Sequence, residues 1–198
     1  MYVDSMQLTR ERIITAAVQL IEREGVDAVS MRRIATELGS GVMSLYNHVP
    51  SKAALLDGVA ERVISSIDVT SVPGASWADE VRAQARAFRQ IARAYPRCTM
   101  VAVSRPTTST SEPPPVEHAL ATLRSAGFGE EDALRIVRAF VAYVVGSLLR
   151  EVGVSPSVAR QQQPDQPPHL SRDHDADFEF GLDLLVRSVA DLRPAVRH

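Results

Sequence analysis

The chain has little cysteine, little lysine and almost no net charge. Cys98 is its only cysteine, so no disulfide can form within the chain and no cysteine cage can hold zinc. Lys52 is its only lysine. The formal net charge is −2, so nucleic-acid binding must be argued from where basic groups lie and not from overall charge.

Long apolar runs are also missing. The first ten residues lack the apolar segment of a signal peptide. The most apolar stretch, 133–149, carries Arg135 and Arg138 and is short for a membrane span. We therefore expect a cytoplasmic protein that does not enter a membrane.

The first 67 residues show apolar side chains at helical spacing, interrupted by short breaks that contain glycine or proline. A serine or threonine stands where each of three helices begins, as expected for a capping residue. The expected helices run from Thr9 to Gly25, from Ser30 to Gly39, over 42–48, and from Ser51 to about Ile67. This order predicts an N-terminal three-helix, helix-turn-helix domain over 1–67.

The same periodicity continues beyond a linker at 68–75, and strand-like alternation is absent from the sequence. Ser76 and Asp79 resemble a capping box at the start of the next helix. Tract 105–115 is polar and irregular, and segment 153–171, rich in proline and glutamine, is expected to be a mobile loop. The remaining helices are expected at 76–95, 116–126, 130–151 and 173–192. We thus predict an all-α protein whose larger helical domain, over 76–198, binds an effector and forms a dimer.

The short segment 42–48 has the composition of a helix that reads DNA. Leu45 is spaced to face inward, which leaves small, apolar and amide side chains suited to base edges in a major groove: Val42, Met43, Ser44 and Asn47. Phosphate oxygens are the expected partners of a second group: Tyr46, His48, Ser51 and Lys52. The alternatives are that Tyr46 is a core aromatic residue and that His48 is structural.

Segment 9–63 carries a series of motifs: Ile14-Thr15-Ala16-Ala17, Leu20-Ile21, Gly25, Ser30-Met31-Arg32-Arg33-Ile34-Ala35, Leu38-Gly39, Leu45-Tyr46-Asn47-His48-Val49 and Lys52-Ala53-Ala54-Leu55-Leu56. Through these residues it resembles the DNA-binding domain of the tetracycline-repressor (TetR) family. The resemblance implies that one set of residues faces bases: Arg32, Val42, Met43, Ser44 and Asn47. It implies that another set anchors the DNA backbone: Ser30, Tyr46, His48 and Lys52. Arg33 is interpreted as a solvated surface charge, and without the resemblance Arg32 would be as well.

The basic and acidic residues of 1–67 nearly balance. This balance predicts modest affinity for DNA of any sequence and a need for dimerisation. It argues against a nucleoid-type scaffold, which would bind DNA indiscriminately with a steep dependence on salt.

The resemblance continues over 77–192. The residues that carry it are Arg105-Pro106, Leu120, Leu123, Gly127-Phe128, Tyr143, Gly146, Phe180-Gly181-Leu182 and Leu185. It implies a four-helix dimer interface made by the last two long helices of each chain, and we expect it to use Phe140, Val144, Leu182 and Leu185. Stretch 136–149 agrees, because it is apolar on more than one face. The alternative is a central core helix in a monomer.

The resemblance also implies an effector pocket. The aromatic and apolar residues that we assign to it are Phe88, Tyr95, Met100, Val103, His118, Phe140 and Tyr143, each of which could instead be plain core. Val101 stands at about the position of a metal-binding histidine in tetracycline repressors, so tetracycline with magnesium is not the expected effector. We expect no cofactor.

The sequence thus predicts a homodimeric, ligand-responsive regulator, a repressor that a small molecule releases from a palindromic operator. An enzyme is the first rival, but the common nucleophile, phosphate-loop and zinc-protease motifs are absent from the sequence. A divalent metal at the cluster His169, Asp173, His174, Asp175 and Asp177 is a weaker alternative to a solvated acidic helix start. We expect no metal.

Overall fold

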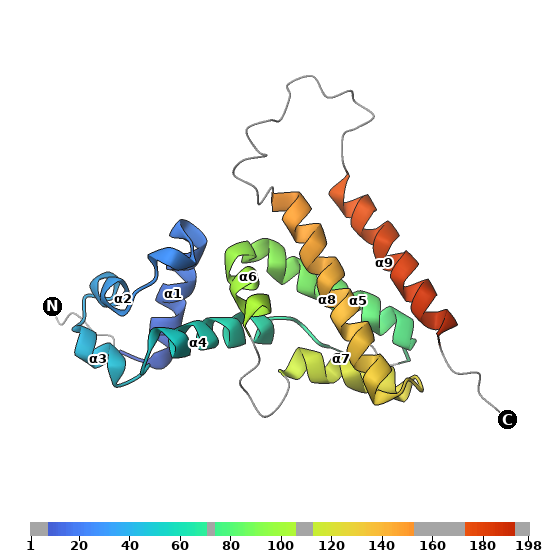
Figure 1. Cartoon of the computed structure of the whole chain (residues 1–198), viewed down its shortest axis with the longest axis horizontal. Coiled ribbons are helices and arrows are strands. Elements are labelled where there is room, and N and C mark those ends of the chain that lie inside the picture. The colour runs from blue at the N-terminus through green and yellow to red at the C-terminus, as the bar shows by residue number, and fades with distance from the viewer. Residues whose placement is uncertain (1–7, 71–73, 106–112, 153–172, 193–198) are drawn as a thin grey trace, which may run out of the picture. The chain divides into compact units, whose positions relative to one another are not determined.

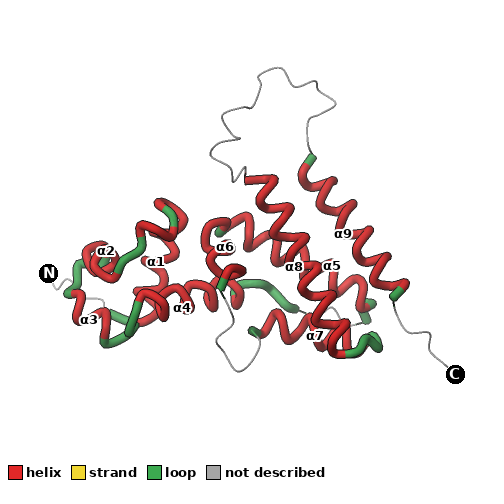
Figure 2. The backbone as a smooth tube through the Cα atoms, viewed as in Figure 1, coloured by secondary structure: helices red, strands yellow, loops and turns green. Residues whose placement is uncertain are grey.

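The computed structural model describes residues 8–70, 74–105, 113–152 and 173–192. Helices are the only regular elements in these ranges, as Figures 1 and 2 show, which confirms the predicted all-α class. By its contacts the chain divides into two units. The first comprises residues 1–66 and 95–111, and the second comprises residues 67–94 and 112–198.

Three helices of the first unit begin at capping residues that the sequence predicted. Its elements are α1 (Arg10–Glu24), the short 3-10 helix η1 (Val26–Ala28), α2 (Met31–Glu37), α3 (Val42–Tyr46), α4 (Lys52–Ser65) and α6 (Pro96–Ser104). The hydroxyl of Thr9 accepts from the N–H of Arg12 at 3.2 Å. Ser30 and Ser51 cap α2 and α4 in the same way, at 3.1 and 3.0 Å. Satisfying these N–H groups fixes where each helix begins.

The core of the first unit is apolar. Its fully buried side chains include Ile13, Leu20, Ile21, Ile34, Leu45, Val49, Leu55 and Val59. Gly39 lies in the turn that follows α2 with φ 62°, a left-handed conformation that favours glycine. Helix α2 contacts both α1 and α3, and α1 contacts α4, which gives the predicted helix-turn-helix.

Helix α6 was not predicted as a helix. Its residues pack against α1 and α4, and contacts therefore group it with the first unit. The predicted domain bounds, 1–67 and 76–198, stay a prediction.

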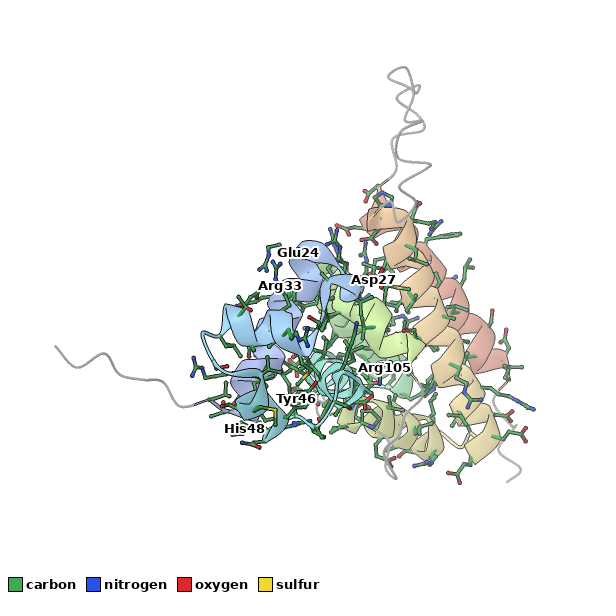
Figure 3. The ribbon with its side chains drawn as sticks, turned by 60° about the vertical axis from the view of Figure 1, so that its left-hand side comes forward. Glu24, Asp27, Arg33, Tyr46, His48 and Arg105 are labelled. Atoms are coloured by element: carbon green, nitrogen blue, oxygen red, sulfur yellow. The ribbon has the colours of Figure 1, made fainter. Side chains whose placement is uncertain are left out.

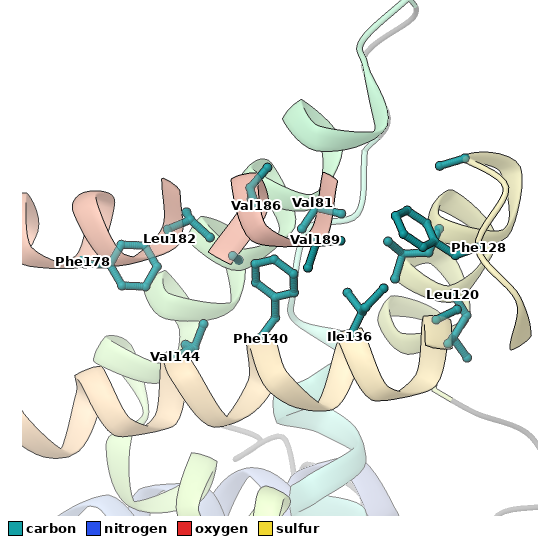
Figure 4. Packing of buried hydrophobic residues seen from close by; sticks show 14 residues of the cluster. Val81, Leu120, Phe128, Ile136, Phe140, Val144, Phe178, Leu182, Val186 and Val189 are labelled. Carbon is teal, nitrogen blue, oxygen red and sulfur yellow. The ribbon is translucent and has the colours of Figure 1, made fainter. Parts of the chain in front are cut away.

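The second unit contains α5 (Trp77–Ala94), α7 (Pro114–Ser125), α8 (Glu130–Val152) and α9 (His174–Asp191). As predicted, Ser76 and Asp79 form the capping pair of α5, with the N–H of Asp79 donating to the Ser76 hydroxyl at 3.2 Å. In Figure 4, the apolar side of α9, from Phe178 to Val189, lies over Phe140 and Ile136 of α8. The segment predicted as a mobile loop, 153–171, lies outside the described residues.

No helix in the described ranges is both long and apolar enough to cross a membrane.

Candidate nucleic-acid interface and ligand site

Helix α3 buries one side chain in the core and exposes most of the others to solvent. Leu45 is completely buried, whereas Met43 and Tyr46 are 75% and 41% exposed. Ser44, Asn47 and His48 are also exposed, and Val42 is half-buried. Figure 3 shows Tyr46 and His48 at the end of α3. The exposure of Tyr46 excludes the alternative that it is a core aromatic residue, and it leaves the predicted contact residues accessible to a ligand.

Two cations near this surface have no partner among the described residues. Of the described basic side chains of α1 to α4, Arg32 and Lys52 make neither an ion pair nor a hydrogen bond, while Arg12 has a contact of its own. The other cations are engaged, in the pairs Arg10–Glu61 and Arg62–Glu11 and in a cluster of Arg23 and Arg33 with Glu24 and Glu37. Arg32 and Lys52 are the two basic residues that the sequence assigned to DNA.

The arginine–glutamate cluster joins the end of α1 to α2, and Glu24 and Arg33 lie close together in Figure 3. Arg33 donates to Glu24 at 2.9 Å. Hydrogen bonds to Glu24 and then to Glu37 raise the pKa of Arg23 above its ordinary value. Arg33 is thus half-exposed and paired with two carboxylates of its own unit.

The two ends of helix α6 are bound to α1 and to α4. The Glu22 carboxylate of α1 accepts from the N–H of Cys98 at 2.7 Å, which caps a helix start that has no side-chain cap of its own. At the other end, the Arg105 guanidinium donates to Asp57 of α4 at 2.6 Å and to the carbonyl of Ala53 at 3.2 Å. Arg105 was noted in the sequence as part of a family motif, but these contacts were not predicted.

Two adjoining hollows lie beside α5 in the second unit, with volumes of about 470 and 460 Å³. Both are lined by Ala75, Glu80 and His118, and the larger is also lined by Gln84 and Gln90. The Gln84 Nε2 atom is buried and lacks a hydrogen-bond partner among the described residues. Since a buried donor without a partner is costly, Gln84 is a ligand-contact candidate that sequence reasoning missed, because its isolation depends on packing.

The residues predicted for the effector pocket fall into three groups. His118 lines both hollows. Phe140 belongs to the core of the second unit, and Phe88 and Tyr143 pack against that core. The other three lie at or within α6 in the first unit: Tyr95, Met100 and Val103.

The residues predicted for the dimer interface lie mostly inside one subunit. Phe140 is 8% exposed, and Val144 and Leu182 are completely buried. Leu185 is half-buried against the same core. The large apolar side chains that α9 leaves exposed are Phe180 and Leu184, at 69% and 51%. The sequence pattern could not separate the two faces of α9, because both carry apolar residues.

Two acidic side chains at the start of α9 bind groups of the chain itself. Asp173 caps the helix by accepting from the N–H groups of Asp175 and Ala176, each at 3.0 Å. Asp175 pairs with Arg89 and Arg93. His169, the other end of the possible metal cluster, lies outside the described residues.

Two parts of the chain match models of known protein families. Residues 13–59 match "Bacterial regulatory proteins, tetR family", and residues 71–168 match "Tetracyclin repressor-like, C-terminal domain". The chain belongs to the TetR family. It is 33% identical over 210 residues to the class A tetracycline repressor from transposon 1721 of Escherichia coli, covering 97% of this chain and 95% of the relative. It is 31% identical over 200 residues to an HTH-type transcriptional regulator of Saccharopolyspora erythraea, covering 92% and 85%.

Solved structures agree with this TetR-family assignment. ActR from Streptomyces coelicolor in complex with actinorhodin matches with a TM-score of 0.74 at 28% identity, covering 93% of this chain and 98% of that one. A single-residue variant of TetR from Acinetobacter baumannii in complex with minocycline matches with a TM-score of 0.75 at 28% identity, covering 96% and 100%. The chain is therefore a ligand-responsive, DNA-binding transcriptional regulator, and its family is one of transcriptional regulators. Its partners are operator DNA and a small-molecule effector.

Proposed function

We propose that this TetR-family regulator is a homodimeric cytoplasmic repressor without catalytic activity, which binds a palindromic operator through α3 and releases it when an effector binds beside α5. The observation that carries this proposal is the pairing pattern around α3. The cations Arg32 and Lys52 are left without partners in a unit whose other described cations are engaged.

The division of work on DNA follows from side-chain chemistry. Arg32, Val42, Met43, Ser44 and Asn47 face base edges, which carry the sequence information. Phosphate contacts fix the register of the protein on the duplex without reading bases. These come from Ser30, Tyr46, His48 and Lys52, and Lys52 is the first residue of α4, where the helix N-terminus also favours an anion.

A second copy of the chain binds the other half-site of the operator. The exposed pair Phe180 and Leu184, one turn apart on α9, supports a helix-to-helix interface between two copies. A symmetric dimer then binds half-sites about one helical turn apart. Leu184→Glu is a cleaner test of this interface than a substitution at Leu182, because Leu182 belongs to the core of its own subunit.

The effector is a small, mostly apolar molecule with an acceptor oxygen. A volume of about 470 Å³ lies within the usual range of ligand sites. The buried Gln84 amide lacks an acceptor among the described residues, and His118 adds a second polar group at the wall. An oxygen placed opposite Gln84 Nε2 would satisfy the donor and orient the molecule.

Release of DNA follows when the effector favours one of two orientations of the heads. Helix α6 continues directly from α5 in the chain and is attached to α1 through Glu22 and to α4 through Asp57. A coupling of about 1–3 kcal/mol corresponds to a loss of operator affinity of roughly 5- to 150-fold. Operator DNA must then weaken effector binding by the same factor.

The test begins with sequencing the genomic fragments that the purified protein retains, because a palindrome among them defines the operator. A compound library is then screened by thermal shift, and operator affinity is measured with each hit. We expect hits that weaken operator binding, and we expect Gln84→Leu to lose their effect while Gln90→Leu, on the same wall, keeps it. Hits that stabilise the protein but leave operator affinity unchanged would support a constitutive DNA binder instead.

A further inference from the structure

Helix α9 is joined to α5 by a ladder of arginine–carboxylate pairs. Arg82 donates to Asp183 at 2.8 Å. Arg86 donates through two nitrogens to Glu179 at 2.9 and 2.7 Å. Arg89 and Arg93 both reach Asp175, at 2.8 and 2.9 Å. Because the numbers rise along α5 as they fall along α9, the two helices run antiparallel.

This ladder repeats itself and so does not by itself fix the position of α9. The carboxylates of α9 recur every four residues at Asp175, Glu179 and Asp183, and three of its buried apolar side chains recur at the same interval, at Phe178, Leu182 and Val186. A displacement of α9 by four residues towards its C-terminal end would put Glu179 opposite Arg82 and Asp175 opposite Arg86. Phe178 would then take the place of Leu182.

Arg89 is the first of two residues whose contacts with α9 would not be remade after a four-residue displacement. Its side chain is 9% exposed, and it donates to Glu151 of α8 at 2.7 Å and to the carbonyl of His174 at 3.0 Å. Its guanidinium carbon also lies 4.3 Å from the centre of the Phe178 ring. Arg89 thereby joins the end of α8 to the start of α9. A displaced α9 would forfeit the contacts with His174 and Phe178.

Tyr143 is the second residue whose contacts with α9 would be lost after the displacement. Its hydroxyl donates to the carbonyl of Phe178 at 2.8 Å, and its ring stacks on that of Phe178 with centroids 5.5 Å apart. The Tyr143 ring can lie this close to α9 because residue 181 of α9, which faces the ring, is a glycine. A Cβ on Gly181 would lie 2.8 Å from the Tyr143 ring, which is closer than real Cβ contacts. After the four-residue displacement, Asp177 would stand in the place of Gly181 and collide with the ring.

We propose that Arg89 and Tyr143 are positioning residues that select one of two near-equivalent registers of α9 on α5. The rungs at Arg82 and Arg86 hold α9 in either register, and the two positioning residues decide between them. The register determines where α9 presents Phe180 and Leu184, so its consequence for operator binding rests on the proposed dimer, whereas the register itself does not.

The test measures the distance between two spin labels on one chain, without DNA or effector. Gln90→Cys on α5 and Ala190→Cys on α9 carry the labels, since both positions are exposed. Cys98 does not compete, because it is buried and burial raises the pKa of its thiol. Labelled protein is diluted in unlabelled protein so that only distances within a chain are observed.

Removal of both positioning residues is the decisive change. Arg89→Met is combined with Glu151→Met, since replacing both partners of a buried pair avoids an unpaired charge, and Tyr143→Ser is then added. We expect a second population in which the label distance is longer by up to about 6 Å, the rise of four helical residues. The control Arg82→Met with Arg86→Met removes two rungs and should keep the single native distance.

A folded variant without the positioning residues that shows only the native distance overturns the proposal, as does a control that lengthens the distance equally. If the triple variant does not fold, Arg89→Lys with Tyr143→Ala replaces it, because it keeps a cation beside Glu151 and still removes the ring that Asp177 would meet in the displaced register. The longer distance is expected there as a minor population. A single native distance in this pair also overturns the proposal.

Discussion

The surface around α3 and the face between α5 and α9 use the same side chains in opposite ways. Around α3, Arg32 and Lys52 are basic groups that no described residue neutralises, on helices that an apolar core holds in place. Between α5 and α9, Arg82, Arg86 and Arg89 all reach carboxylates of α8 or α9. In the first unit, Arg23 and Arg33 are neutralised by carboxylates of their own chain, whereas the exposed Arg32 and Lys52 are left for a partner outside it.

The largest expected effect comes from replacing Arg89, the buried arginine between α5 and α9, without changing its partners. Arg89→Met leaves the buried Glu151 carboxylate with only the longer pair to Arg93, at 3.5 Å, and we expect the free energy of unfolding to fall by up to about 3–5 kcal/mol. Arg86→Met removes a pair that is half-exposed and should cost about 0–1 kcal/mol. Denaturant unfolding of both variants measures the difference. Equal losses would mean that burial does not distinguish the rungs.

On the α3 surface, substitutions should change DNA binding and leave stability intact. We expect Lys52→Ala to weaken binding to all DNA sequences alike, since a phosphate contact reads no bases. Ser44→Ala should instead change which operator is preferred, by about 1–3 kcal/mol for each base-edge hydrogen bond that is removed. Titrations against a panel of operator variants separate the two effects. A shift of sequence preference in Lys52→Ala would contradict the assignment.

Glu22 tests whether α6 depends on α1 for its start. Glu22→Ala removes the carboxylate that accepts from the N–H of Cys98, and loss of a helix cap costs about 0.5–2 kcal/mol. The first turn of α6 should then open more often. The rate at which Cys98 reacts with a thiol reagent should therefore rise by roughly 2- to 30-fold. Glu24→Ala, on the same helix, is the matched control and should leave the rate unchanged. An unchanged rate in Glu22→Ala would show that the Glu22 carboxylate does not hold the first turn of α6 closed.

The smallest effect concerns pH. Hydrogen bonds from Arg89, Arg86 and Arg82, in that order, hold the pKa values of Asp175, Glu179 and Asp183 below their ordinary values. A carboxylate whose pKa is lowered by folding stabilises the folded state above its unfolded pKa, and this contribution is lost as the pH falls through its folded pKa. The stability difference between the native chain and Arg86→Met should therefore shrink below about pH 4. A difference that stays constant from pH 7 to the acid transition would exclude an ionic origin.

Local signals predicted much of the fold because each rests on neighbouring residues. Thr9, Ser30, Ser51 and Ser76 lie next to the N–H groups that they cap, and their helices begin where predicted. The inward position of Leu45 follows from spacing alone. Helix α6 escaped prediction because it is short and its cap comes from Glu22, distant in the sequence.

The residues that the sequence assigned to sites met different outcomes for the same reason. Exposure of Met43, Tyr46 and their neighbours on α3 could be predicted from one short helix with a single inward residue. Leu182, by contrast, was assigned to the dimer interface, and the packing of α9 on α5 and α8 buries it while Leu184, two residues further on, stays exposed. The isolation of Gln84 Nε2 likewise depends on what surrounds it.

The sequence by itself determined the all-α class, the capped helices of the first 66 residues and the likeness to the TetR family, because periodicity, caps and motifs are local. Only the tertiary structure decided which cations are neutralised and which remain available. Arg33 and Arg32 are neighbours of one type, yet Glu24 reaches the first and no described residue reaches the second. Ion pairing depends on distances between helices, and such distances exist only once the chain has folded.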